Sequence, residues 1–121
     1  MDWHVAPDGL RDVLVGLNET YRPPEIIVTE NGAAYPDTVD ADGQVHDPLR
    51  VAYLARHVAA AADALDAGVP LTGYHAWSLL DNYEWSLGYE RRFGLVHVDF
   101  DSQRRTLKDS ARWYQRLIAR E

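Results

Sequence analysis

The stretch of sequence that most constrains the fold is residues 26–32, Ile-Ile-Val-Thr-Glu-Asn-Gly. Three β-branched apolar residues run directly into a polar turn, a pattern typical of a strand that is buried on both faces and ends abruptly. A buried strand seldom ends in a carboxylate, but in parallel α/β folds the active site lies at the carboxyl ends of the strands. Glu30 is therefore a candidate catalytic carboxylate, and the alternative is a solvated residue that opens a loop.

The sequence on either side of this strand predicts a βαβ unit. Residues 7–21 place apolar side chains on one face of a helix that precedes the strand. Residues 47–68 begin with Asp-Pro and end with Gly, the usual start and stop of a second helix. The apolar face that we expect this helix to bury consists of Val51, Leu54, Val58, Ala61, Ala62 and Leu65. Residues 71–80 form a second strand candidate, and a strand, a long helix and a strand in this order require parallel pairing.

The C-terminal part of the chain is less regular. Residues 81–92 are a charged loop rich in aromatic side chains, and residues 93–100 are a short strand candidate. Thr-Leu-Lys-Asp at 106–109 resembles a capping box that opens a last helix. Two apolar parallel strands need neighbours on both edges. We therefore expect an α/β fold in which residues 1–121 are one incomplete domain, the C-terminal portion (about the last two βα units) of a (β/α)8 TIM barrel.

Composition and charge exclude several classes of partner. The net charge of −7 argues against a nucleic-acid partner, and no apolar run is long enough for a membrane span. The chain has no cysteine, which fits a reducing compartment, and we expect a cytoplasmic location. His46, His57, His75 and His97 lack metal-ligand spacing, and Arg91-Arg92 is interpreted as a solvated pair. We expect neither a metal nor another cofactor.

Polar and aromatic residues gather where the two strand candidates end. The first strand ends in Glu30, and the second ends in Trp77, which is followed by Asp81, Glu84 and Trp85. In a barrel these two ends lie side by side on one rim. A single Trp is more often a core residue, but indoles grouped with carboxylates suit a sugar. Indole faces pack against the C–H faces of a pyranose ring, and carboxylates accept hydrogen bonds from its hydroxyls.

Three linked motifs carry a resemblance to a known family. Residues 29–32, Thr-Glu-Asn-Gly, and residues 77–85, Trp-Ser-Leu-Leu-Asp-Asn-Tyr-Glu-Trp, resemble C-terminal signatures of the family 1 glycoside hydrolases, the β-glucosidase family. Gly-Tyr at 88–89, Arg-Phe-Gly-Leu at 92–95 and Val-Asp at 98–99 resemble the same family. The spacing between the motifs also fits, and the similarity extends over nearly the whole chain.

The resemblance implies a role for each matching residue. Glu30 matches the nucleophile that attacks the anomeric carbon and forms a covalent glycosyl-enzyme, as a retaining mechanism requires. Trp77 matches the aromatic floor under the sugar at the cleavage point. Glu84 matches the carboxylate that holds two hydroxyls of the non-reducing sugar, and Trp85 matches an indole that donates to a neighbouring hydroxyl. Phe93 matches an aromatic wall near the same sugar.

Two features define what the resemblance implies for this chain alone. Glu84 implies unphosphorylated β-D-glycosides, since relatives that act on 6-phosphorylated sugars typically lack a carboxylate there. The Asn-Glu-Pro motif that carries the acid/base glutamate in this family is absent. The implied partners are a β-glycoside or oligosaccharide substrate and the N-terminal remainder of the barrel, without which we expect no activity. The alternatives are a non-catalytic carbohydrate-binding remnant or an inactive truncated product, and the preference for glucoside, galactoside or fucoside is left open.

Overall fold

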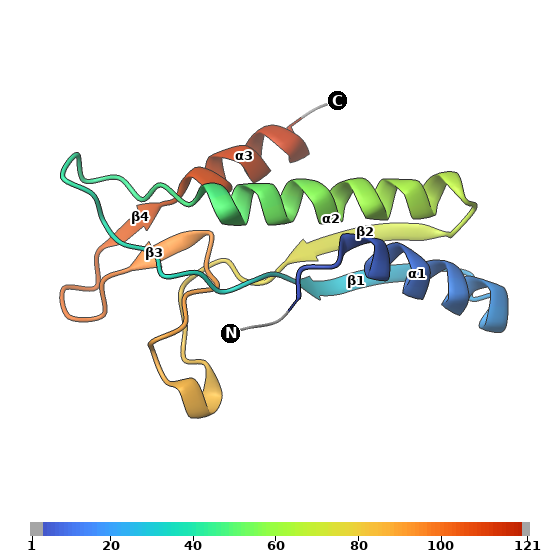
Figure 1. Ribbon diagram of the computed structural model, residues 1–121, viewed down its shortest axis with the longest axis horizontal. Helices are drawn as coiled ribbons and strands as arrows, with labels where there is room; N and C mark the ends of the chain where they lie inside the picture. Colours follow the sequence, from blue (N-terminus) through green and yellow to red (C-terminus); the bar gives the residue numbers. More distant parts are fainter. Residues whose placement is uncertain (1–3, 120–121) are drawn as a thin grey trace.

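The computed structural model describes residues 4–119. Its elements, in chain order, are α1 (Pro7–Tyr21), β1 (Ile26–Asn31), α2 (Pro48–Asp66), β2 (Leu71–Ala76), the short 3₁₀ helix η1 (Trp85–Leu87), β3 (Val96–Val98), β4 (Arg105–Leu107) and α3 (Asp109–Ile118). Figure 1 shows β1, β2, α1 and α2 running along the long axis of the molecule, with β3 and β4 at one end. None of the described helices combines the length and the hydropathy that a membrane crossing requires.

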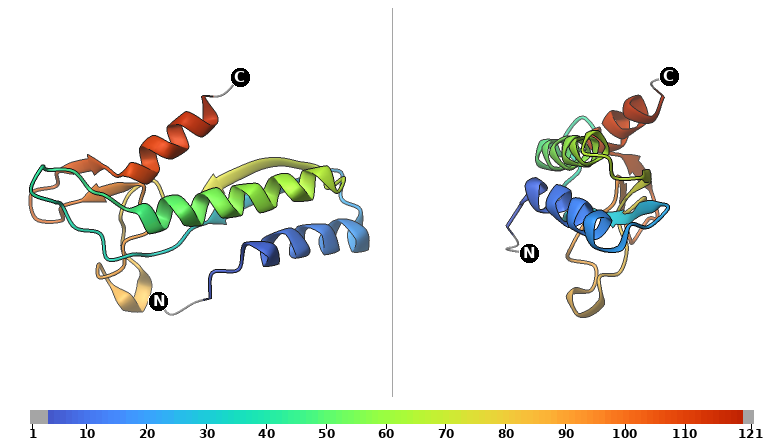
Figure 2. Two further views of the ribbon diagram at one scale, coloured as in Figure 1. Left: turned by 45° about the horizontal axis from the view of Figure 1, so that its top comes forward. Right: turned by 90° about the vertical axis from the view of Figure 1, so that its right-hand side faces the viewer.

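The predicted βαβ unit is confirmed. Strands β1 and β2 pair in parallel, with Ile26 opposite Leu71 and Val28 opposite Tyr74, and α2 connects them. Helices α1 and α2 pack against each other and lie on the same side of the strand pair (Figure 2). Strand β2 ends at Ala76, four residues before the predicted end, because the chain leaves the ladder there to enter the loop that carries the aromatic residues.

The core lies between the strand pair and the two helices. Leu14 of α1, Val28 of β1 and Ala64 of α2 form a buried cluster with Val69, which precedes β2. Burial of β1 on both faces was predicted, and this prediction is wrong for the chain as described, because Ile27 is 46% exposed. Successive strand side chains point to opposite faces, so Ile27 points to the face that α1 and α2 do not cover.

The buried face of α2 differs from the predicted one. The buried residues of the helix are Arg50, Leu54, His57, Ala60, Ala61 and Ala64. Val51, Val58, Ala62 and Leu65 are therefore not the core positions, and the last three instead line an open groove between α2, β2 and α3. Leu54 and Ala61 are buried as predicted. The rest of the prediction is wrong because it counted only apolar residues, whereas the true face includes a buried arginine and a buried histidine.

The C-terminal hairpin replaces the predicted capping box. Thr106 pairs with His97 in the antiparallel β3–β4 ladder, and α3 begins only at Asp109. No side chain caps this helix, and the side chain of Lys108 at its N-cap position is completely buried. The strand predicted over residues 93–100 is reduced to three residues, Val96–Val98. The hairpin and α3 therefore bring a buried cation to the end of the molecule where the strand ends lie.

Candidate active site

The carboxyl ends of β1 and β2 meet, as the sequence predicts. The Trp77 backbone N–H donates a hydrogen bond to the Asn31 carbonyl oxygen at 2.9 Å. A β-carbon built on Gly32 would lie 1.8 Å from the Trp77 carbonyl oxygen, so only glycine permits this approach. The residue after Glu30 is thus bonded to the backbone of Trp77, which brings the two predicted site residues to adjacent strand ends.

A tyrosine pair fixes the backbone beside Glu30. The Tyr74 hydroxyl donates to Asn31 Oδ1 at 2.7 Å, and the Tyr114 hydroxyl of α3 donates to the Tyr74 carbonyl at 3.0 Å. Burial raises the pKa of Tyr74, so its hydroxyl remains a proton donor throughout the physiological range. Asn31, the immediate neighbour of Glu30, is therefore held from the side chain and from the backbone.

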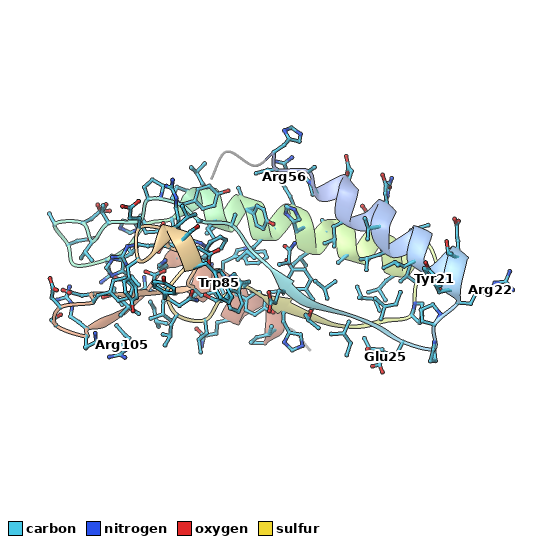
Figure 3. All side chains as sticks on the ribbon, turned by 90° about the horizontal axis from the view of Figure 1, so that it is seen from below. Tyr21, Arg22, Glu25, Arg56, Trp85 and Arg105 are labelled. Atoms are coloured by element: carbon cyan, nitrogen blue, oxygen red, sulfur yellow. The ribbon has the colours of Figure 1, made fainter. Side chains whose placement is uncertain are left out.

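The other sugar-site candidates of the second loop are accessible. Trp77 is 38% exposed and Trp85 is 81% exposed, while Glu84 is half-buried and Glu30 is exposed. Figure 3 shows Trp85 far from Glu25, which lies at the opposite end of the strands. The Glu84 N–H donates to the Gly88 carbonyl at 2.7 Å, and this hydrogen bond closes the turn that carries Glu84 and Trp85.

Phe93 lies in a more enclosed position than the other candidates. Its side chain is only 6% exposed and lines a cavity of about 200 Å³ with Tyr35, Tyr53, His57 and other residues. The cavity is bounded by the loop after β1 and by α2. The Phe93 carbonyl accepts a hydrogen bond from the Ser78 N–H at 3.2 Å, beside Trp77. Its role as a wall of the sugar site stays a prediction.

A buried ion cluster lies behind the two strand ends. We use this name for six side chains, Asp37, Asp47, Arg50, Asp81, Arg92 and Lys108. Lys108 Nζ lies 2.5 Å from Asp37 Oδ2 and 2.8 Å from Asp81 Oδ1. Arg50 lies 2.7 Å from Asp37 and 2.6 Å from Asp47, and Arg92 lies 2.7 Å from Asp81. Three carboxylates face three cations, so the cluster is neutral when all six groups are ionised.

Asp81 is part of this cluster and not a pocket carboxylate. Burial alone would raise the pKa of Asp81, but the hydrogen bonds from Lys108 and Arg92 outweigh burial and hold the pKa below its ordinary value. Its Oδ1 also accepts the Gly94 N–H at 2.9 Å. The interpretation of Arg92 as a solvated residue is likewise wrong, because its guanidinium donates to Asp81 and to the Val98 carbonyl.

Sequence reasoning missed most of the buried ion cluster. The one local signal was the spacing of Asp47 and Arg50, which are three residues apart and form an ion pair on the first turn of α2. Asp47 stands at the predicted N-cap but makes no capping bond. Its carboxylate instead accepts the Ser110 N–H at 2.8 Å and the Ser110 hydroxyl.

Among residues 4–119, one group has the spacing to hold a metal ion. Asp40, Asp42 and His46 bring ligand atoms within 4.8 Å of one another, and all three are exposed. Both ring nitrogens of His46 are engaged, Nδ1 with Asp109 at 2.7 Å and Nε2 with Asp42 at 3.2 Å. The arrangement ties the loop after β1 to α3 through hydrogen bonds among the side chains themselves.

Comparison with known proteins identifies the family to which this chain belongs. A sequence model described as Glycosyl hydrolase family 1 matches residues 1–121. Beta-glucosidase A of Thermotoga maritima is 49% identical over 118 residues, which are 98% of this chain and 26% of that protein. The bifunctional beta-D-glucosidase/beta-D-fucosidase of Bifidobacterium breve is 50% identical in an alignment of 123 positions that covers 98% of this chain and 27% of that protein.

A solved structure gives the same result for the backbone. The family 1 β-glucosidase from Thermotoga maritima in complex with isofagomine lactam matches with a TM-score of 0.95 and 49% identity, covering 96% of this chain and 26% of that one. The chain therefore spans about a quarter of the length of the relatives it matches. These relatives are TIM barrels, of which the described residues form a segment without a closed barrel. The chain belongs to glycosyl hydrolase family 1.

Proposed function

We propose that this chain is the C-terminal part of a retaining β-glycosidase that hydrolyses unphosphorylated β-D-glycosides. The observation that carries the proposal is the contact between the ends of β1 and β2, where Asn31 accepts the Trp77 N–H and Gly32 lies against the Trp77 carbonyl. This contact brings a carboxylate at position 30 and an indole at position 77 to neighbouring strand ends, in a chain of a glycoside hydrolase family.

The proposed reaction has two displacement steps. A carboxylate oxygen of Glu30 attacks the anomeric carbon, and the glycosidic C–O bond breaks with its electron pair on the aglycone oxygen. That oxygen takes a proton from a general acid in the preceding part of the barrel. Water then attacks the same carbon, the deprotonated acid accepts the water proton, and Glu30 leaves as a carboxylate.

The exposed side chains of the second loop supply the sugar contacts of the proposal. The accessible face of Trp77 suits stacking against the C–H face of a pyranose, and the Trp85 indole N–H is free to donate to a hydroxyl. Glu84, presented by the turn closed with Gly88, would accept two hydroxyl hydrogen bonds. A 6-phosphate near that carboxylate would be repelled, which favours unphosphorylated glycosides.

The proposed partner is the preceding part of the barrel. Val13, Leu17 and Tyr21 form an exposed apolar stripe on α1, and Ile27 of β1 is exposed on the face without helices. The groove between α2, β2 and α3 is lined mainly by apolar side chains, including Val58, Leu65, Leu71, Leu117 and Ile118. Further strands and helices of a barrel would remove these surfaces from water, which stabilises the assembly.

The test uses a completed barrel. We define it as this chain joined to the part of Thermotoga maritima beta-glucosidase A that precedes the matching region. The completed barrel should hydrolyse 4-nitrophenyl β-D-glucoside much faster than its 6-phosphate, and Glu30→Gln should abolish the reaction. A folded completed barrel that binds glucose-like inhibitors but hydrolyses no glycoside would favour the non-catalytic, carbohydrate-binding alternative. Faster hydrolysis of the 6-phosphate would contradict the proposed substrate class.

A further inference from the structure

The buried ion cluster connects the loop after β1 to the loop after β2. Arg50 on α2 pairs with Asp37 at 2.7 Å and donates to the Ala33 carbonyl at 3.4 Å, both in the loop that follows Glu30. The same guanidinium donates to the Arg92 carbonyl at 2.6 Å, in the loop that follows Trp77. One fully buried side chain therefore bonds both loops.

Lys108 makes a second connection between the same loops. Its ammonium lies 2.5 Å from Asp37 in the first loop and 2.8 Å from Asp81 in the second. Asp81 in turn accepts the Gly94 N–H at 2.9 Å, and a β-carbon on Gly94 would lie 2.2 Å from the Asp81 nitrogen. The second loop therefore packs so closely against Gly94 that no side chain would fit at this position. Lys108 connects this loop to the first loop.

Backbone hydrogen bonds lead from the cluster to the sugar-site candidates. The Leu95 N–H donates to the Ser78 carbonyl at 2.8 Å, and the Ser78 N–H donates to the Phe93 carbonyl at 3.2 Å. Gly94, which Asp81 holds, lies between Phe93 and Leu95, and Ser78 directly follows Trp77. The position of Trp77 is therefore linked to Asp81 through three hydrogen bonds.

We propose that Lys108 is a positioning residue of the glycosidase site, a proposal that rests on the proposed function. Lys108 is completely buried, so its ammonium has no contact with solvent. By pairing with Asp37 and Asp81 it fixes the position of Trp77 relative to Glu30, together with that of Glu84, which follows Asp81 by three residues. A cation between the two carboxylates fixes the distance and orientation of one loop relative to the other. An apolar side chain at the same place would fill the space without selecting one relative position of the loops.

The test replaces Lys108 while leaving each carboxylate a partner. In Lys108→Met, Asp37 keeps Arg50 and Asp81 keeps Arg92. The double variant Asp37→Asn/Lys108→Met removes one charge of each sign, so the cluster stays neutral, and it serves if the single variant does not fold. Leu14→Ala is the matched control, because Leu14 is buried in the core cluster and makes no contact with the ions. Leu14→Ala should lower stability without changing the buried ion cluster.

The readout is a ratio that does not depend on the folded fraction. In the completed barrel, kcat/KM for 4-nitrophenyl β-D-glucoside is divided by kcat/KM for each of its monodeoxy analogues. Misplaced hydroxyl contacts lower this ratio, so Lys108→Met should lower it about tenfold for at least one analogue, the lower end of the loss of a charged hydrogen bond. Leu14→Ala should leave every ratio unchanged. Unchanged ratios in both Lys108 variants would overturn the positioning role.

A spectroscopic readout separates this proposal from the proposed function. A completed barrel without glycosidase activity overturns the proposed function but leaves the positioning proposal open to an NMR test. The NMR resonance of the Trp77 indole N–H, assigned by its loss in Trp77→Phe, then decides the positioning proposal. A resonance that shifts in the Lys108 variants but not in Leu14→Ala supports the connection between Lys108 and Trp77. A resonance that coincides with the parent in both Lys108 variants contradicts it.

Discussion

At the scale of single residues, Glu84 tests the sugar contacts of the proposed site. In the completed barrel, Glu84→Ala should raise the transition-state free energy for an unphosphorylated glucoside by several kcal/mol, at about 1.5–3 kcal/mol for each charged hydrogen bond that is lost. The measurement is kcat/KM. Glu90→Ala is the matched control, because Glu90 is an exposed carboxylate in the same loop. Equal kinetics for Glu84→Ala and the parent would show that Glu84 is only a rim charge.

His46 gives a prediction for the dependence of stability on pH. The hydrogen bond to Asp109, and to a smaller extent the one to Asp42, raises the pKa of His46 above its ordinary value of 6.5. The guanidinium of Arg112 also lies 3.6 Å from the Asp109 carboxylate. Because the folded-state pKa is the higher one, the stabilisation is complete below pH 6.5 and is lost as the pH rises through the raised value. His46→Ala should therefore lower the Tm of the completed barrel at pH 5.5 to 6, by an amount that shrinks as the pH rises to 9. A Tm difference that grows with pH would contradict this sign.

At the scale of the elements, the sequence predicts the parts that follow from periodicity. The helix over Pro7–Tyr21 and the parallel βαβ unit are found as predicted, because apolar spacing and the Pro and Gly boundaries determine them locally. The face of α2 was predicted wrongly, since Arg50 and His57 are buried there and an apolar pattern cannot include them. The adjacency of Glu30 and Trp77 was predictable, because the carboxyl ends of neighbouring parallel strands lie at the same edge of a sheet.

The buried ion cluster was not predictable from the same patterns. Asp37 lies among turn residues, Asp47 stands at a helix start and Lys108 lies in an apparent capping box, so each has an ordinary local explanation. Lys108 and Asp37, which form an ion pair, are 71 residues apart in the sequence. Only the tertiary fold brings these charges together, and a buried charge is tolerated only when such partners are present.

The corrected face of α2 predicts different costs for two leucines of the helix. Leu54 is 1% exposed, whereas Leu49 is 63% exposed and does not line the groove between α2, β2 and α3. In the completed barrel, Leu54→Ala should lower the free energy of unfolding by about 2–5 kcal/mol, because it leaves a cavity in a packed core. Urea denaturation measures this cost. Leu49→Ala should cost less, and a loss for Leu49→Ala as large as that for Leu54→Ala would contradict the burial of Leu54 in the core.

At the scale of the whole molecule, the exposed apolar surface predicts the behaviour of the isolated chain. The uncovered face of β1 and the groove between α2, β2 and α3 remain in contact with water when the 121 residues stand alone. The isolated chain should therefore associate or partly unfold, which size-exclusion chromatography and circular dichroism measure.

The isolated chain should also be inactive. General-acid assistance contributes about 10²–10⁴-fold to such reactions, and the Asn-Glu-Pro motif expected to supply it is absent from the chain. An assay with an activated aryl β-glucoside should therefore show turnover only after the preceding part of the barrel is added. A monodisperse monomer that turns over this substrate without the added part, and loses the activity in Glu30→Gln, would contradict the incomplete-site account.

The central claim is that Glu30 is the nucleophile, and covalent trapping tests it most directly. A 2-deoxy-2-fluoro-β-D-glucosyl fluoride slows both displacement steps, while its good leaving group lets the first step proceed, so the glycosyl-enzyme should accumulate. Peptide mass spectrometry of the inactivated completed barrel should find one fluoroglucosyl group on the peptide that contains residues 26–32, with fragmentation assigning it to Glu30. A label on another residue, with Glu30 unmodified, would contradict the account.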